Sequence, residues 1–247
     1  MELRGQVAGL HYEARLPQQT IQPPWPLLLF LHGAGERGDA MGEQLHRVKT
    51  HGPWGCPGAE QFLLVAPQCH TDLVWPALVD ELVSFMQHIT EEFVVDGSRM
   101  YITGLSMGAY GLWALLHARP SLFAAAVPIC GAFTPAVPRR TGLPTLLALA
   151  TRAVDAEAVQ RLAGLPVWLF HGDKDKIVDV AGSRNAFRAL GGEARGEDLR
   201  MTICAGVAHN VWDLAYETPE VYAWLLSRRS LGGALCEGVR GPLPEGG

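Results

Sequence analysis

The sequence predicts an α/β fold in which a mostly parallel sheet is covered by helices on both faces. Short apolar runs alternate along the chain with longer segments whose apolar residues recur at helical spacing, and this alternation is typical of such folds. The length of 247 residues suits one large domain. The 48% hydrophobic content excludes a disordered chain. We therefore expect one domain over residues 1–229 and a glycine-rich, disordered tail over residues 230–247.

The strands of the predicted sheet are nearly continuous apolar runs, which indicates that both of their faces are buried. An additional antiparallel edge strand is expected at the start of the chain, over Val7–Leu16. The six runs predicted to form the buried strands are Pro26–Leu31, Gln61–Ala66, Met100–Gly104, Ala124–Ile129, Pro166–Phe170 and Leu199–Ala205.

The predicted helices lie between these strands. Ala77–Val94 carries apolar residues at steps of three and four, which is the pattern of an amphipathic helix. Three further helices are expected over Met107–Ala118, Val180–Leu190 and Glu220–Arg228. The last of them has Thr218 as its N-cap and Pro219 at its first position. Within the segment Thr134–Gly164, residues Thr145–Leu162 also read as a helix. It is either a small cap over a pocket or a crossover helix, and we favour the crossover because covering helices are routine in α/β folds.

Charge and cysteine content narrow the class of protein. Twenty basic and 25 acidic residues give a net charge of −5, which argues against a nucleic-acid partner. The longest uninterrupted apolar stretch, Trp25–Leu31, is far too short to span a membrane, and the N-terminus does not read as a signal peptide. Five dispersed cysteines without a C-x-x-C pair argue against a disulfide framework and against a metal site. We expect a cytoplasmic protein.

The strongest local motif is Gly104-Leu105-Ser106-Met107-Gly108, between a predicted strand and a predicted helix. A G-x-S-x-G sequence in this context forms a nucleophile elbow, a strained turn that lifts the serine hydroxyl clear of the sheet. The two glycines avoid the collisions that side chains would make across the turn. The alternative is an ordinary strand-to-helix turn that contains a serine.

A serine nucleophile needs a base and an acid to orient that base. Among nine histidines, His209 follows the last predicted strand, at the sheet edge where the serine is also expected. The order Ser106, Asp175, His209 is the chain order of the triad in α/β-hydrolases. Asp173 and Asp179 compete for the role of the acid. We expect the former to fix the turn and the latter to cap the next helix.

The other histidines are interpreted as structural. His32 and His171 each end a strand, and the remaining six are assigned to the core or the surface. A tetrahedral intermediate needs two backbone N–H donors, for which we select Met107 and, in the glycine-rich loop after Leu31, Ala34. A phosphate-binding loop is the rival interpretation of that loop, but the loop lacks the Lys-Ser/Thr ending. Glu36 and Arg37 are either a solvated pair or a brace for the loop.

Five stretches of the chain resemble a known family. They lie between about Leu10 and Leu226 and read LFLHGAGERGD, TGLSMGAYGLW, PICGAF, PVWLFHGDKDKIV and AHNVWDLAYE. Together they are similar to the α/β-hydrolase group of dienelactone-hydrolase-like and phospholipase/carboxylesterase-like serine esterases, in the branch described as esterases or predicted peptidases. Ser106 stands where dienelactone hydrolases themselves carry cysteine. The resemblance implies the α/β-hydrolase fold, a triad of Ser106, Asp175 and His209, and ester hydrolysis through an acyl-enzyme without a cofactor.

The sequence therefore predicts a carboxylesterase-type serine hydrolase that acts on a small-molecule ester and needs no metal and no cofactor. Trp75, Trp212 and Tyr216 are candidates for the lining of its pocket, with packing beneath the loops as the alternative for each. A thioesterase or a small-peptide peptidase on the same triad is the alternative enzyme. The alternative outside enzymes is a non-catalytic binding module of the same fold. The sequence carries no signal for an oligomeric state.

Overall fold

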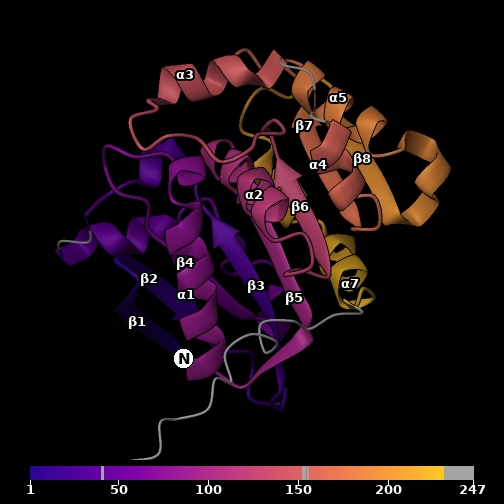
Figure 1. The fold of residues 1–247 in the computed structure, drawn as a ribbon. Coiled ribbons are helices and arrows are strands. Elements are labelled where there is room, and N and C mark those ends of the chain that lie inside the picture. The colour runs from indigo at the N-terminus through magenta and orange to yellow at the C-terminus, as the bar shows by residue number, and fades with distance from the viewer. Residues whose placement is uncertain (40–41, 152–153, 155, 231–247) are drawn as a thin grey trace, which may run out of the picture.

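A computed structural model describes residues 1–39, 42–151, 154 and 156–230 of the chain (Figure 1). Its centre is an eight-stranded sheet with the strand order β1-β2-β4-β3-β5-β6-β7-β8. The strands are β1 (Glu2–Val7), β2 (Leu10–Arg15), β3 (Trp25–Leu31), β4 (Leu63–Pro67), β5 (Val95–Leu105), β6 (Ala125–Ile129), β7 (Val167–Gly172) and β8 (Leu199–Cys204).

The six strands from β3 to β8 run parallel to one another, as the continuous apolar runs predict. At the edge, β1 and β2 form an antiparallel hairpin, and β2 pairs antiparallel with β4. The expectation of one edge strand over Val7–Leu16 was wrong. The chain turns at Ala8 and Gly9, both with positive φ, so that this segment holds the end of one strand and the whole of the next. Strand β5 also begins five residues earlier than its apolar run.

Two layers of helices cover the sheet, because alternate strand residues point to opposite faces. In β3, Leu27, Leu29 and Leu31 belong to one buried cluster, and Leu28 and Phe30 belong to the other. The first cluster takes in α1 (Val79–Glu92), α2 (Met107–Ala118) and α5 (Ala181–Ala189), with the shorter α3 (Leu143–Leu147) and α4 (Ala156–Arg161). The second takes in α6 (Trp212–Tyr216) and α7 (Pro219–Leu226).

Short 3₁₀ helices occupy several of the connections, and none of them was predicted. They are η1 (Ala34–Glu36), η2 (Gly42–Lys49), η3 (Ala59–Gln61), η4 (Trp75–Ala77), η5 (Ala148–Thr151) and η6 (Gly192–Asp198). The helix α6 was missed as well, because five residues are too few to carry a periodic pattern. The first two 3₁₀ helices lie on the loop that follows β3 and bear directly on the site described below.

The crossover from β6 to β7 differs from its prediction. The single helix expected over Thr145–Leu162 is instead divided into α3, η5 and α4. Figure 1 shows α3 above the upper edge of the sheet, toward which α2 also extends. At the last helix, Thr218 occupies the N-cap position as predicted, but its hydroxyl makes no capping bond and donates instead to the carbonyl of Leu214.

The topology places the ends of all six parallel strands at one edge of the sheet. Because β3, β5, β7 and β8 are parallel, the loops that follow them all leave from the carboxyl edge, where ligands bind in open α/β sheets. No helix in the described part of the chain is long and apolar enough to cross a membrane. Of the tail predicted to be disordered over residues 230–247, residues 231–247 lie outside the described residues. The last described residue, Ser230, donates its backbone N–H to the carbonyl of Ser98.

Candidate active site

Ser106 stands on a sharp turn between β5 and α2. Its φ of 51° and ψ of −119° place it in a region that residues with a side chain rarely adopt. The turn is held by a hydrogen bond from the N–H of Ser106 to the carbonyl of Ile129 on the neighbouring strand. The strand–turn–helix context predicted for the serine is therefore present.

The glycines of the motif permit a close backbone approach. A Cβ on Gly108 would lie 1.9 Å from the carbonyl oxygen of Leu31, at the end of β3. A Cβ on Gly104 would lie 2.7 Å from the backbone of Gly108. Helix α2 therefore begins directly against the end of β3, which brings the serine next to the glycine-rich loop.

A chain of short hydrogen bonds connects the three residues predicted to form a triad. Nε2 of His209 lies 2.9 Å from Oγ of Ser106, and Nδ1 of the same ring lies 2.6 Å from Oδ2 of Asp175. Because a carboxylate oxygen only accepts, Nδ1 carries a proton and Nε2 is left to accept the serine hydroxyl. This arrangement can remove a proton from Ser106 as its oxygen attacks a carbonyl carbon.

The carboxyl group of Asp175 is fully buried and fully hydrogen-bonded. Oδ1 accepts from the backbone N–H groups of Ile177 and Val178, at 2.8 and 2.9 Å. Nε2 of His171 lies 3.2 Å from Oδ2, the oxygen that also contacts His209. Burial works against ionisation, but the hydrogen bonds from the two histidines and the two N–H groups hold the pKa of Asp175 well below its usual range. The residue is therefore a carboxylate over the whole range in which a histidine base works.

The other two aspartates on this loop have the local roles expected of them. Asp173 accepts the N–H of Gly206 at 2.7 Å and so ties the loop after β7 to the loop after β8. Asp179 accepts the N–H of Ala181 at 2.8 Å. The N-cap position of α5 is Val180 rather than Asp179, so the aspartate stabilises the helix start from one residue earlier than predicted.

The two predicted oxyanion donors both lie at helix starts. Ala34 is the first residue of η1 and Met107 is the first residue of α2, and neither helix has a side-chain cap. The first N–H groups of a helix have no partner within the helix, so these two are free to bind a developing negative charge. The contact between Gly108 and the end of β3 brings the two helix starts to the same place.

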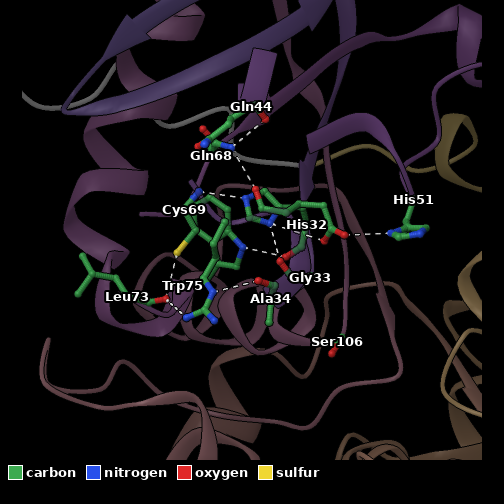
Figure 2. Close-up of polar contacts among 12 residues, drawn as sticks. His32, Gly33, Ala34, Gln44, His51, Gln68, Cys69, Leu73, Trp75 and Ser106 are labelled. Atoms are coloured by element: carbon green, nitrogen blue, oxygen red, sulfur yellow. Dashed lines mark hydrogen bonds and ion pairs between the residues drawn. The ribbon is translucent and has the colours of Figure 1, made fainter. Parts of the chain in front are cut away.

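Side-chain hydrogen bonds hold the loop that carries Ala34, and Figure 2 shows those of His32 and its neighbours. Arg37 donates to the carbonyls of Ala34 and Leu73, so it braces the loop rather than forming a solvated pair with Glu36. Nδ1 of His32 lies 2.6 Å from the carbonyl of Gly33, and its Nε2 accepts the N–H of Cys69. Burial lowers the pKa of His32 to about 4, so the ring is neutral and acts structurally, as predicted.

A pocket of about 300 Å³ opens over Ser106 and His209. Its apolar wall includes Leu143 and Leu147 of α3, so the Thr134–Gly164 segment is a crossover that also lines the pocket. The other lining residues are Gly33, Ala34, Gly35, Glu36, His51, Leu105, Ile177 and Trp212. Within the described residues, no group of three or more His, Cys, Asp or Glu side chains is arranged to hold a metal ion.

Of the three aromatic residues predicted for the pocket, Trp212 lines it and the other two do not. Trp75 is fully buried beneath the oxyanion loop, where its indole N–H donates to the carbonyl of His32. Tyr216 is buried in the core, with its hydroxyl 3.0 Å from that of Thr103. Trp75 packs against Gly111 of α2, and the ring of Tyr216 lies 5.9 Å from that of Phe30, which is the packing alternative stated for each.

Sequence reasoning missed His51 and Glu36 as pocket residues and His171 as a neighbour of the acid. His51 follows no predicted strand, so no sequence signal marked it. His171 was recognised as the end of a strand, but its position next to Asp175 depends on how the following loop folds back.

Comparisons with known proteins bear on this geometry. A family model described as the prolyl oligopeptidase family matches residues 77–136, which include the serine turn. A thermostable esterase is similar over 93% of this chain, with 27% identity and a TM-score of 0.72. This chain spans 63% of the length of that esterase. A comparison with curated protein sequences finds no match.

The chain has the α/β-hydrolase fold.

Two more distant structures share this fold. An acetyl xylan esterase from Aspergillus awamori is 14% identical, with a TM-score of 0.65, and the match covers 91% of this chain and 99% of the esterase. A puromycin-hydrolysing peptidase from Mycobacterium tuberculosis is 15% identical, with a TM-score of 0.63, over 94% of this chain and 39% of the peptidase. The structures that share this fold therefore include both esterases and a peptidase.

Proposed function

We propose that this protein is a serine hydrolase that cleaves small carboxylic esters through an acyl-enzyme on Ser106. The observation that carries the proposal is the continuous hydrogen-bonded chain from Ser106 through His209 to Asp175, of which Ser106 and His209 line a pocket. A non-catalytic binding module has no need for this geometry, which supports an enzyme over that alternative.

In the proposed reaction, Oγ of Ser106 attacks the ester carbonyl while Nε2 of His209 takes the hydroxyl proton. The N–H groups of Met107 and Ala34 stabilise the oxyanion of the tetrahedral intermediate. The imidazolium then donates its proton to the leaving alcohol, and the acyl group stays on Ser106. Water attacks the acyl-enzyme by the same steps in reverse and releases the acid. Asp175 keeps the imidazole in one orientation throughout and stabilises its charged form.

The size and walls of the pocket support a small substrate. About 300 Å³ lies at the lower end of the range for small-molecule sites. Leu143, Leu147 and Ile177 offer an apolar surface to an acyl or alcohol chain. The esterases among the structural neighbours agree with this assignment. Because a peptidase family model also matches, the assay should include substrates with an amide bond.

A substrate panel tests the proposal. 4-Nitrophenyl esters of two to sixteen acyl carbons would be compared with a butyryl thioester and with aminoacyl 4-nitroanilides. We expect hydrolysis of the short and medium esters, little turnover of the longest, and a lower kcat/KM on thioesters and anilides. Faster cleavage of the anilides would overturn the ester assignment in favour of a peptidase. A fluorophosphonate probe should label the wild-type protein and leave Ser106→Ala unlabelled.

A further inference from the structure

The pocket contains a second histidine–carboxylate pair that the proposed mechanism does not use. Nδ1 of His51 lies 3.0 Å from Oε1 of Glu36. Both residues line the pocket that also contains Ser106 and His209. In Figure 2, His51 and Ser106 lie to the same side of the loop at Gly33 and Ala34, and Cys69 and Leu73 lie to the other.

Glu36 is placed to hold this histidine rather than to serve the loop. The residue is 7% exposed, so its carboxylate is almost fully buried. Its neighbour Arg37 is turned away toward the carbonyls of Ala34 and Leu73. His32 lies 4.0 Å from the other carboxylate oxygen, but its ring is neutral and its Nδ1 is bound to the carbonyl of Gly33. Among the described residues, the side-chain hydrogen bond to the Glu36 carboxylate comes from His51.

The ring of His51 is fixed on a second side by an aromatic contact. It lies 5.2 Å from the ring of Trp212, which in turn lies 5.6 Å from the ring of His209. The next residue, Gly52, packs so tightly that a Cβ there would lie 2.5 Å from the ring of Phe30. The side chain of His51 is nevertheless 40% exposed. The ring is therefore held in place while one part of it stays open to the pocket.

This arrangement determines which atom is left for a ligand. A carboxylate only accepts hydrogen bonds, so Nδ1 of His51 carries the proton that it shares with Glu36. Among the described residues nothing else bonds to this ring, and Nε2 remains available. In the neutral ring Nε2 accepts a hydrogen bond, and in the charged ring it donates one. A hydroxyl group both donates and accepts, so it satisfies Nε2 in either state.

The geometry points to His51 as a specificity-determining residue that binds a hydroxyl group of the substrate. The inference rests on the proposed ester hydrolysis, because the hydroxyl must belong to an ester held over Ser106. The favoured substrate is then an ester that is mostly apolar, to match Leu143, Leu147 and Ile177, and carries one hydroxyl that reaches His51. That hydroxyl belongs either to the alcohol part, as in a polyol ester, or to the acyl part, as in a phenolic acid ester.

Two matched pairs of esters test the inference and separate the two sources. The alcohol pair is 1-butyrylglycerol and propyl butyrate. The acyl pair is methyl 3-(4-hydroxyphenyl)propanoate and methyl 3-phenylpropanoate. Within each pair the readout is the ratio of kcat/KM for the hydroxyl ester to that for its partner, so that a general loss of activity cancels.

In the wild-type protein we expect this ratio to favour the hydroxyl ester in one of the two pairs, and that pair identifies the source. His51→Phe keeps a ring against Trp212 but has no nitrogen, and it should lower the ratio about tenfold, which corresponds to about 1.4 kcal/mol. His51→Gln restores a group that both donates and accepts and should recover part of the ratio. His88→Phe, which removes an exposed histidine of α1, is the matched control and should leave the ratio unchanged.

The two possible failures are distinguishable. If the wild-type protein hydrolyses these esters but His51→Phe leaves both ratios as they were, the role of His51 is overturned and the esterase proposal stands. If neither the four esters nor the 4-nitrophenyl esters are hydrolysed, the proposed function is overturned. The role of His51 in binding a substrate hydroxyl is then overturned as well.

Discussion

Nε2 of His171 lies 3.2 Å from Oδ2 of Asp175, the same carboxylate oxygen that is 2.6 Å from Nδ1 of His209. Nε2 of His171 also lies 3.0 Å from the carbonyl of Val178, and its Nδ1 lies 2.8 Å from the hydroxyl of Ser183. His171 is fully buried, so these contacts fix its ring. Asp175, the proposed catalytic acid, is thus positioned by a second histidine at the end of β7.

Replacing His171 should therefore lower turnover although the residue is remote from the substrate. His171→Phe removes a hydrogen bond to a charged group, worth about 1.5–3 kcal/mol, and we expect kcat to fall roughly ten- to a hundredfold with a smaller change in KM. His171→Gln keeps a donor and should lose less. Circular dichroism would establish that both variants are folded. Unchanged kcat in a folded His171→Phe would show that Asp175 needs no support from this ring.

Asp175→Asn should have the largest effect of the three aspartate variants on this loop. Asparagine favours the wrong tautomer of His209, and a loss of about 10⁴ in kcat is the scale known for a comparable triad aspartate. Asp179→Asn should change turnover little and cost less than about 1 kcal/mol of stability, because the amide oxygen can still accept the N–H of Ala181 at the start of α5. Asp173→Asn should lower kcat far less. Near-normal turnover by Asp175→Asn beside a collapse in either other variant would mean that the acid is assigned wrongly.

Ser106→Ala and Ser106→Gly should both abolish ester turnover, apart from a small residual rate from the oxyanion hole. They should differ in stability, because φ at this position is 51° and glycine adopts positive φ without strain. We expect the glycine variant to be more stable than the alanine variant by about 1 kcal/mol, measured by denaturant unfolding. The reverse order of stability would argue that the turn relaxes when the hydroxyl is lost.

Gly172→Ala should separate the acid from the base. A Cβ at Gly172 would lie 2.3 Å from the backbone carbonyls of Val207 and Ala208, so the loop that carries His209 would have to move. Since a displacement of about 1 Å can cost 10²-fold, we expect kcat to fall by about that factor. Gly164→Ala is the matched control, because no atom lies within 4 Å of the added Cβ, and it should behave like the wild type. Full activity in Gly172→Ala would mean that the two loops adjust without moving the triad.

Stability should decrease as the pH falls from about 6.5 to about 4. His32 is neutral when folded, with a pKa lowered to about 4 by burial, whereas in the unfolded chain it binds a proton below its ordinary value of 6.5. The unfolded state thus gains protons first, and the loss reaches about 3 kcal/mol near pH 4. The depressed pKa of Asp175 adds a further loss of stability, which begins only below its ordinary value of 3.8.

Unfolding free energies of the wild type, His32→Gln and the exposed control His88→Gln, measured between pH 6.5 and pH 4, would test the contribution of His32. The first variant should show a shallower slope over this range, and an unchanged slope would contradict the role of His32.

The sequence determined the architecture because a strand buried on both faces is a continuous run of apolar residues, which can be recognised locally. The apolar runs of β3, β4, β6 and β7 are continuous since both sheet faces are covered there. The bounds of these strands and of the edge strand β8 differ from the predicted ones by two residues or fewer. The hairpin at Ala8 was missed because the turn is short and lies within one alternating stretch. The crossover helix was predicted as one piece because its composition, rich in alanine and leucine, does not mark the breaks after α3 and η5.

The site was predictable where topology alone positions a residue. Ser106, Asp175 and His209 each follow a parallel strand, so their arrival at one edge of the sheet follows from the strand order, and the order of the three along the chain selects them. The tertiary structure decided what surrounds them. His51 contacts Glu36 and Trp212 only because loops far apart in the chain fold together over the edge of the sheet. His171 contacts Asp175 because the loop after β7 folds back on the end of that strand. Contacts of this kind depend on close backbone approaches, such as that of Gly172 to Ala208, and these leave no periodic pattern in the sequence.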